Sequence, residues 1–283
     1  MAQSSKFPSE AEVVIVGVGG IVGSMVAYWL AELGQKNIVG LEKSTIIPSD
    51  IASTAHASDF VYNTTHDKLG CWATNFSRKF YEDHGFFLKK GGLEICRKDD
   101  DARWEELKRK VESGKAFGTN IRLISASEAK EKFPLLDEDS IRGAMWDPDA
   151  GLVTPRSQDV VNFAVETAKE KGALSTFTDT PAIDFDIENG RITGVKTDKG
   201  TIKTNKVVIT SGIWGPLMGK KAGVPVPLMP VEHPLLFFGP LPEIQGTEEL
   251  LVYPLLRDQG NSAYVRDTGR LHGGMLEWGY YED

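Results

Sequence analysis

The stretch from residue 12 to residue 42 constrains the fold more than any other part of the sequence. Glu12–Val18 is a short β-branched run that ends in glycines, which is typical of a buried parallel strand. Apolar residues then recur at helical spacing through Ile21–Leu33, and Gly34 closes that segment as a helix C-cap. Asn37–Leu41 predicts a second strand, which ends at Glu42. The pattern is a βαβ unit of roughly 30 residues, the size of a mononucleotide-binding half of a Rossmann-like α/β fold.

The loop between the first strand and the helix is rich in glycine from Gly17 to Gly23. Missing side chains let the backbone approach a diphosphate, whose charge meets exposed N–H groups and the positive end of the helix dipole. Glu42 follows Gly23 by 19 residues, where a carboxylate accepts hydrogen bonds from a ribose and repels the extra phosphate of NADP. The predicted ligand is FAD or NAD, and the predicted contacts are Gly17, Gly19, Gly20, Ile21, Val22, Gly23, Glu42 and Lys43.

The glycine spacing departs from the usual fingerprint at one position. Counting back from Glu42 aligns Gly20 and Gly23 with the second and third fingerprint glycines, which places Val18 where the first should be. Either the turn is shifted by one residue, or the phosphate loop is slightly wider than usual.

Size, charge and cysteine content narrow the class of protein. A chain of 283 residues is long enough for two interleaved subdomains. The net charge of −8 provides no basic stripe, so we expect a small-molecule ligand and neither nucleic acid nor a membrane as partner. Cys71 and Cys96 are too few for a disulfide framework, and no metal site is expected. With no apolar signal segment and no run of 18 uncharged apolar residues, the expected location is the cytoplasm.

The segment after Glu42 carries a more specific pattern, EKSTIIPSDIASTAHASDF. Its centre resembles the motif GSTxHAxG of the D-amino-acid-oxidase-like FAD-dependent oxidoreductases, in the branch of dimethylglycine oxidase, dimethylglycine dehydrogenase and sarcosine dehydrogenase. Ala52 and Asp59 replace the two glycines of that motif. The resemblance implies FAD, and it implies that His56 is bonded covalently to the 8α carbon of the flavin. The matching cofactor residues are Ser53, Thr54, His56 and Ala57.

The similarity continues along the chain. GGLE at 91–94 resembles the strand that opens the substrate-side sheet of the family, and KFPLL at 132–136 resembles its FPLL signature. VVITSGIW at 207–214 resembles a strand and turn near the flavin, written NAAGFW in relatives. This implies cofactor contacts at Gly212 and Trp214. It also implies an α/β protein in which a Rossmann-like FAD-binding domain (1–90 and 145–225) is interleaved with a substrate domain built on a mixed or antiparallel sheet (91–144 and 226–283).

Two further positions match substrate-side residues of the family, His233 in PVEH and Tyr264 in SAYVR. The resemblance implies that both line the pocket over the flavin. A histidine with a pKa of about 6.5 can hold or relay the amine proton, because the amine must be neutral to surrender hydride. Tyr264 could orient the substrate or share the relay. Arg266 and Arg257 are candidate clamps for the substrate carboxylate, since a guanidinium meets a carboxylate bidentately.

The implied reaction is oxidation of a secondary or tertiary amine, in particular an N-methylated amino acid, to an imine that water opens to an aldehyde and a demethylated amine. Oxygen or a carrier protein would take the electrons. Two other hypotheses stay open: a catalytically incomplete FAD-binding subunit, and an NAD-dependent dehydrogenase. Relatives continue past the position of Glu282 and return to the cofactor domain, so we expect a truncated chain with a second polypeptide or a missing C-terminal segment as a possible partner.

Overall fold

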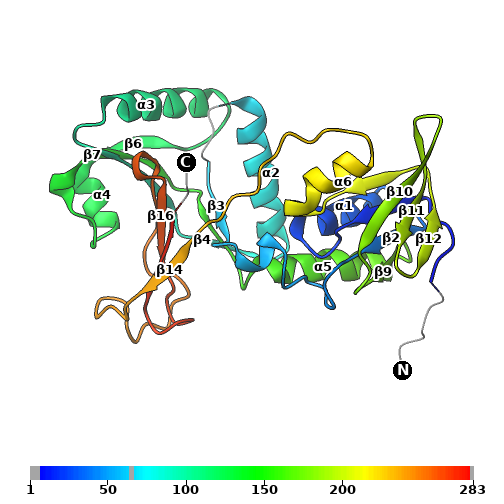
Figure 1. The fold of residues 1–283 in the computed structure, drawn as a ribbon. Coiled ribbons are helices and arrows are strands. Elements are labelled where there is room, and N and C mark those ends of the chain that lie inside the picture. The colour runs from blue at the N-terminus through cyan, green and yellow to red at the C-terminus, as the bar shows by residue number, and fades with distance from the viewer. Residues whose placement is uncertain (1–6, 64–66, 281–283) are drawn as a thin grey trace. The chain divides into compact units, whose positions relative to one another are not determined.

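The computed structural model describes residues 7–63 and 67–280. The chain divides into two compact units, each assembled from two separate stretches (Figure 1): unit 1 comprises residues 1–58 and 155–230, and unit 2 comprises residues 59–154 and 231–283. Residues 59–63, 67–90 and 145–154, which the sequence analysis assigned to the FAD-binding domain, lie in unit 2 and supply strands to its sheets.

Unit 1 is built on a parallel sheet of four strands in the order β13-β1-β2-β9. Valine and isoleucine fill β1 on both faces, as expected of a sheet covered on both sides. Two helices that pack together cover one face, with Ala27 and Val161 against Ile15. The elements are β1 (Val13–Val16), α1 (Ile21–Glu32), β2 (Ile38–Leu41), η1 (Ser53–His56), α5 (Ser157–Glu170), β9 (Leu174–Phe177) and β13 (Val207–Ile209).

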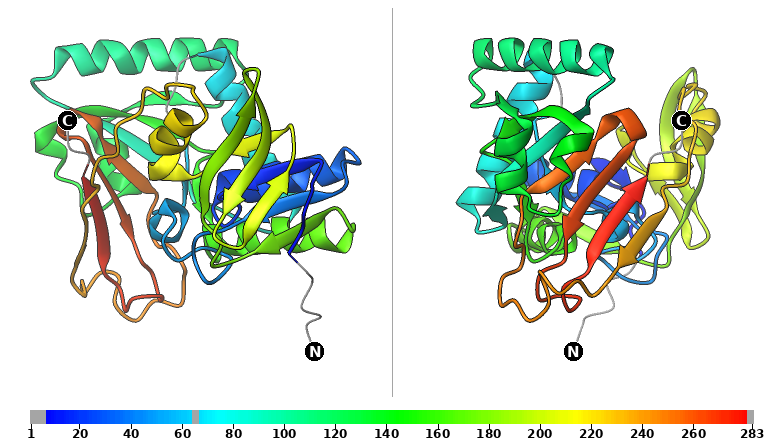
Figure 2. Two further views of the ribbon diagram at one scale, coloured as in Figure 1. Left: turned by 45° about the vertical axis from the view of Figure 1, so that its right-hand side comes forward. Right: turned by 90° about the vertical axis from the view of Figure 1, so that its left-hand side faces the viewer.

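A second, antiparallel sheet covers the other face of the parallel sheet. Figure 2 shows its three strands in yellow-green, and Phe185, Val195 and Ile202 join one core with Val14 and Leu41. The elements are β10 (Ala182–Glu188), β11 (Arg191–Thr197), β12 (Gly200–Lys203), η3 (Gly212–Trp214) and α6 (Gly215–Lys221). The result is a three-layer unit with the parallel sheet in the middle.

Unit 2 is built on a mixed sheet in the order β14-β17-β16-β15-β5-β7-β6, in which only the β15–β5 pair is parallel. Leu107 of α3 (Asp101–Ala116) packs with Met145 on one face, and Ala129 of α4 (Ala126–Lys132) packs with Ile95 on the other. The strands of this sheet are β5 (Gly92–Arg97), β6 (Arg122–Ser125), β7 (Ile141–Asp147), β14 (Leu235–Phe238), β15 (Leu255–Asp258), β16 (Ala263–Asp267) and β17 (Leu276–Tyr280). The expected combination of a Rossmann-like part with a mixed-sheet part is confirmed.

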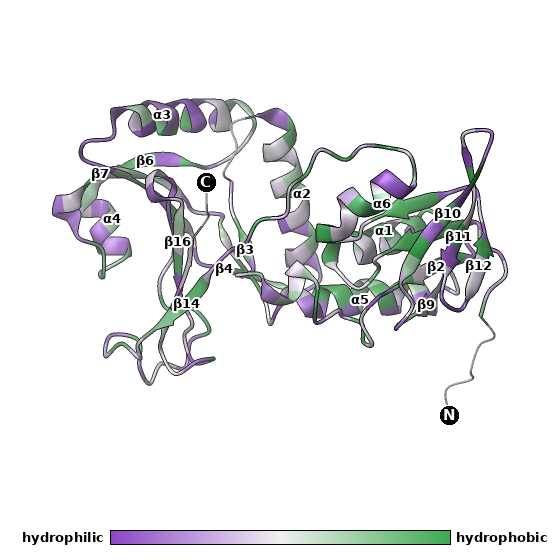
Figure 3. Ribbon diagram, in the orientation of Figure 1, coloured by the Kyte–Doolittle hydropathy of each residue, from purple (hydrophilic) through white to green (hydrophobic). Residues whose placement is uncertain are grey.

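The rest of unit 2 is a small sheet, β3-β8-β4, with the remaining helices. These elements are β3 (Phe60–Val61), α2 (Lys68–Asp83), β4 (Phe87–Lys89), α3 (Asp101–Ala116), α4 (Ala126–Lys132), η2 (Glu138–Ser140), β8 (Gly151–Val153) and η4 (Gln259–Asn261). Figure 3 shows α3 as mostly hydrophilic, and no described helix combines the length and apolar character that a membrane span requires.

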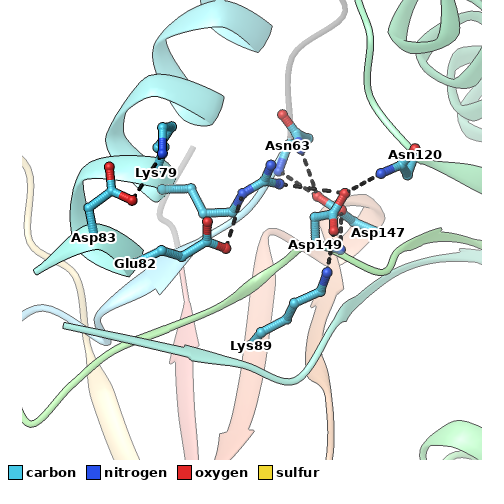
Figure 4. A network of polar contacts seen from close by, with 9 residues as sticks. Asn63, Lys79, Glu82, Asp83, Lys89, Asn120, Asp147 and Asp149 are labelled. Atoms are coloured by element: carbon cyan, nitrogen blue, oxygen red, sulfur yellow. Dashed lines mark hydrogen bonds and ion pairs between the residues drawn. The ribbon is translucent and has the colours of Figure 1, made fainter. Parts of the chain in front are cut away.

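A polar network fixes the turn between β7 and β8 (Figure 4). Asp147 is fully buried and accepts hydrogen bonds from the backbone N–H and the side-chain amide of Asn63, both at 3.0 Å. Asp149 accepts from Lys89 at 2.5 Å and from Asn120 at 2.6 Å. The turn is therefore tied to β4 and to the loop before β6 by charged hydrogen bonds.

Candidate dinucleotide-binding site

A cavity of about 500 Å³ opens in unit 1 where the parallel strands end and α1 begins. Val16 and Leu41, the last residues of β1 and β2, form part of its wall together with the glycine loop. The carboxyl edge of a parallel sheet is where open α/β folds bind ligands. The lining residues are Val16, Gly17, Gly20, Ile21, Val22, Leu41, Glu42, Lys43, Ser49, Ile51, Ala52, Ser53, Thr54, Thr180, Pro181, Ala182, Thr210, Ser211, Gly212, Ile213, Trp214, Leu217 and Met218.

The glycine loop uses a turn that is shifted by one residue. Gly17 has a φ of +95°, so the backbone conformation that favours glycine falls there and not at Val18. Val18 is fully buried, and its side chain lies against Gly40 of β2, where a Cβ would come within 2.9 Å of Val18 Cγ1. Gly40 thus makes room for the valine that replaces the first fingerprint glycine.

Two other glycines of the loop have different roles. Gly23 lets the backbone of α1 approach the loop closely, and Gly20 leaves space for a ligand. A Cβ on Gly23 would lie 2.1 Å from the carbonyl oxygen of Gly17, so α1 packs directly on the loop. A Cβ on Gly20 would meet nothing closer than Thr54 Oγ1 at 3.5 Å. The first turn of α1 carries no acidic side chain, so the positive end of its dipole is not neutralised there. An anion such as a diphosphate fits this position.

Glu42 lies at the end of β2 with only 6% of its surface exposed. Its Oε2 accepts a hydrogen bond from the N–H of Gly19 at 2.9 Å, and its Oε1 accepts from the N–H of Ser44 at 2.9 Å and from Ser49 Oγ at 3.2 Å. A carboxylate offers about four acceptor sites, so three bonds leave one free on Oε2. The side chain is held rigidly beside the cavity and can accept one ribose hydroxyl.

Lys43 and Trp214 form part of the cavity wall together. The ammonium nitrogen of Lys43 lies 4.2 Å from the centre of the Trp214 ring, a cation–π distance. Trp214 belongs to η3, which follows the end of β13, so the pair connects the segments that follow β2 and β13 at the carboxyl edge of the parallel sheet. The aromatic face offers a planar apolar surface for a ligand ring.

The turn with the candidate tether, η1, starts at the cavity and leads away from it. Ser53 and Thr54 line the cavity, whereas His56 is exposed and, like Ala57, is not among the lining residues. Thr54 Oγ1 accepts a hydrogen bond from the N–H of Ile21 at 3.0 Å, which ties the turn to the start of α1. His56 Nε2 lies 3.1 Å from the carbonyl oxygen of Asp50. If Nε2 donates there, Nδ1 keeps the free lone pair.

Both residues that replace motif glycines retain a backbone that suits the turn. Asp59 has a φ of +61°, the left-handed region that glycine would occupy most easily and that Asp tolerates better than most residues. Ala52 is extended, with φ of −78° and ψ of 146°, a conformation open to any residue. Neither replacement therefore requires a backbone conformation that its own residue type cannot adopt.

The substrate-side residue Tyr264 is buried in β16 of unit 2. Its ring contacts Phe60 edge-on with centroids 5.4 Å apart, and it covers Gly279, where a Cβ would lie 1.9 Å from Tyr264 Cζ. Arg257 lies opposite Tyr264 on the neighbouring strand β15, and its guanidinium is 5.9 Å from the ring of Tyr62. Burial raises the pKa of Tyr62 well above its usual value. These three side chains share one face of the mixed sheet.

The other two substrate-side predictions have different surroundings. Arg266 is 3% exposed, and its Nε and Nη2 both donate to Glu277 Oε2, at 2.9 and 2.6 Å. Its predicted role as a carboxylate clamp stays a prediction, with two of its five donors already used. His233 is exposed in the segment between α6 and β14.

Several lining residues were not predicted from the sequence. They follow β9 and β13, the strands on either side of β1 and β2. Thr210 fixes β13 to the loop, since its Oγ1 donates to the carbonyls of Val16 and Gly17 at 3.1 and 3.0 Å. Lys199 holds the segment before β10 by donating to Asp179 O and Thr180 Oγ1 at 2.6 and 2.8 Å. The ends of all parallel strands share one edge, so these segments could have been found once the strand order was known.

The parallel sheet, the glycine loop, the buried carboxylate at the end of β2 and the open cavity are the features of a dinucleotide-binding fold. The family model of the FAD dependent oxidoreductases (DAO) matches residues 12–282. The chain therefore belongs to the FAD dependent oxidoreductase family. The loop, the spare acceptor of Glu42 and the cavity fit the ADP half of FAD.

Comparisons with individual proteins agree with this family. The chain is 29% identical to the mitochondrial sarcosine dehydrogenase of Homo sapiens over 99% of its own length, and 29% identical to the mitochondrial pyruvate dehydrogenase phosphatase regulatory subunit of Mus musculus over 99%. It spans 30% and 31% of these two relatives. The crystal structure of L-proline dehydrogenase from P. horikoshii matches with a TM-score of 0.80 at 31% identity, covering 96% of this chain and 70% of that one.

Proposed function

We propose that the protein uses FAD to oxidise a secondary or tertiary amine, in particular an N-methylated amino acid such as sarcosine or dimethylglycine. The family match over residues 12–282 carries this proposal, and the open cavity beside Glu42 supports it. The resemblance to sarcosine dehydrogenase supports the substrate class. FAD rather than NAD follows from the family.

FAD supplies the acceptor for a hydride from the carbon next to the amine nitrogen. The glycine loop and Glu42 bind the cofactor. Other residues of the chain accept the amine proton and bind the carboxylate of the substrate. His233 or Tyr264 accepts the proton that the substrate's ammonium group must lose to become a neutral amine. Arg257 pairs with the substrate carboxylate. Water then opens the imine to an aldehyde and the demethylated amine, while oxygen or a carrier protein accepts the two electrons.

The proposed tether joins Nδ1 of His56 to the 8α carbon of the flavin. Nδ1 of His56 would supply the electron pair of this bond, its ring would release the Nε2 proton to solvent, and oxygen or the carrier protein would take up the two electrons that bond formation leaves on the cofactor. The hydrogen bond of Nε2 to Asp50 supports Nδ1 as the nucleophilic nitrogen. A covalent link would retain the flavin and can raise its reduction potential.

Acid precipitation of the purified, FAD-loaded protein tests the cofactor and the tether together. We expect a yellow pellet from the wild type, and a yellow supernatant from His56→Ala. His272→Ala, which changes an exposed histidine of unit 2, is the control and should keep its pellet yellow. Anaerobic addition of sarcosine or dimethylglycine should then bleach the flavin, and bleaching by neither would overturn the substrate assignment.

A second candidate function is that of a flavin-binding subunit without turnover of its own. One relative is named as a regulatory subunit, which favours keeping this candidate. Flavin that stays oxidised with every amine, yet binds tightly, would support it. A second polypeptide that restores bleaching would instead support an incomplete catalytic chain. The cytoplasmic location also stays a proposal, which cell fractionation can test.

A further inference from the structure

Arg156 donates hydrogen bonds to the backbone carbonyls on both sides of His56. It is the residue directly before α5, and its Nη2 donates to the carbonyl oxygen of Ala57 at 3.2 Å and more weakly to that of Ala55 at 3.5 Å. These two carbonyls flank His56 in the chain. All of these residues belong to unit 1, so the contact lies within one compact body.

The physical need for such a contact follows from helix geometry. The last carbonyls of a short helix have no partner inside the helix and otherwise bond to water. The η1 helix contains only four residues, Ser53–His56, and cannot hold itself in place. A charged donor that serves two of its terminal carbonyls stabilises the end of the turn more strongly than a neutral donor would.

Separate contacts fix the rest of the turn. Its start is tied to α1 through the hydrogen bond between Ile21 N–H and Thr54 Oγ1 at 3.0 Å. The imidazole itself is placed by Asp50, whose carbonyl lies 3.1 Å from Nε2. Arg156 supplies the third anchor, at the end of the turn, on the residue next to the histidine.

We propose that Arg156 is a positioning residue for His56: by holding the carbonyls of Ala55 and Ala57 it keeps the imidazole in one place and orientation for bond formation with the flavin. This inference rests on the proposed tether. Removing the guanidinium leaves the cavity walls and the glycine loop in place, but lets the end of the turn move. Displacing a reacting group by about 1 Å can slow a reaction on the order of a hundred-fold.

The test measures the rate of tethering and the affinity for FAD separately. Apo-protein is incubated with FAD, and the flavin in the acid-precipitated pellet is followed over time for the wild type, Arg156→Gln, Arg156→Lys and the control Arg191→Gln, which alters an exposed arginine of β11. Affinity is measured by fluorescence titration in the His56→Ala background, with and without Arg156→Gln, so that no tether forms.

We expect Arg156→Gln to slow tethering on the order of ten- to a hundred-fold while the Kd for FAD changes less than about three-fold. Arg156→Lys should lie in between, because an ammonium cannot reproduce the guanidinium geometry. Tethering of both variants at the wild-type rate would overturn the role of Arg156 alone. If Arg156→Gln lowers the affinity for FAD in the His56→Ala background by the same factor as it slows tethering, the positioning role is overturned. Such a result would indicate a general effect of the substitution on the fold. A colourless wild-type pellet would overturn the tether itself, and the role of Arg156 with it.

Discussion

At the scale of single residues, the buried carboxylate of Glu42 is the candidate partner of the cofactor's ribose. Glu42→Gln keeps the shape, but its amide NH2 would face the N–H donors that now surround the carboxylate. We expect the affinity for FAD to fall about ten-fold or more, since hydrogen bonds to charged groups contribute about 1.5–3 kcal/mol. A fluorescence titration measures this, with Glu188→Gln at the exposed end of β10 as control. Unchanged affinity would mean that the ribose lies elsewhere.

Ser211 is a lining residue that the sequence analysis did not predict. It lines the cavity, and its buried Oγ has no hydrogen-bond partner among the described residues. Ser211→Ala should therefore weaken FAD binding several-fold if rotation of the hydroxyl lets it reach the cofactor. A Kd equal to that of the wild type, in the same titration, would show that the hydroxyl makes no bond to FAD.

Both cysteines are buried thiols that form no disulfide within the described part of the chain. Burial is the main cause that raises the pKa of the Cys96 thiol to about 11. Only about one molecule in ten thousand then carries the Cys96 thiolate at pH 7, so labelling of Cys96 by a thiol reagent should require unfolding. Rapid labelling of this residue in the native protein would contradict the structure.

At the scale of elements, the fit between the glycine loop and β2 depends on the pair Val18 and Gly40. Gly40→Ala should destabilise the protein by about 1–3 kcal/mol, because the new methyl group meets the Val18 side chain. Adding Val18→Ala should recover part of that loss, so a double-mutant cycle from urea unfolding should give a clear coupling energy. If the changes in the free energy of unfolding from Gly40→Ala and Val18→Ala simply add, the two side chains do not contact each other.

The turn between β7 and β8 should make stability depend on acid pH. Burial alone would raise the pKa of Asp149, but hydrogen bonds from Lys89 and Asn120 and the nearby Arg78 outweigh it and lower the pKa. Because the folded-state pKa is depressed, the carboxylate contributes stability above the unfolded value of about 3.9, and this is lost as the pH falls through the folded-state pKa. Asp149→Asn should cost up to about 1 kcal/mol at pH 6 and almost nothing near pH 2. Urea unfolding across this range measures it, and a pH-independent difference would contradict it.

At the scale of the whole molecule, local patterns predicted the first βαβ unit because period, glycines and Glu42 all lie within one short segment. The position of the turn could not be decided, since it depends on the packing of Val18 against Gly40 of the neighbouring strand, which the residue pattern does not show. Strands β3 and β4 belong to unit 2 because they pair with β8, a contact between distant segments. The pairing of Arg266 with Glu277 likewise depends on the register of β16 and β17, which composition does not encode.

The most direct test of the account is a titration of the purified apo-protein with FAD, followed through tryptophan fluorescence. Trp214 lies in the cavity wall, so a ligand there should quench it. We expect saturable binding of one FAD per chain, much tighter than the binding of NAD, and a smaller signal in Trp214→Phe. Absence of binding, or equal affinity for NAD, would contradict the assignment of this cavity to FAD.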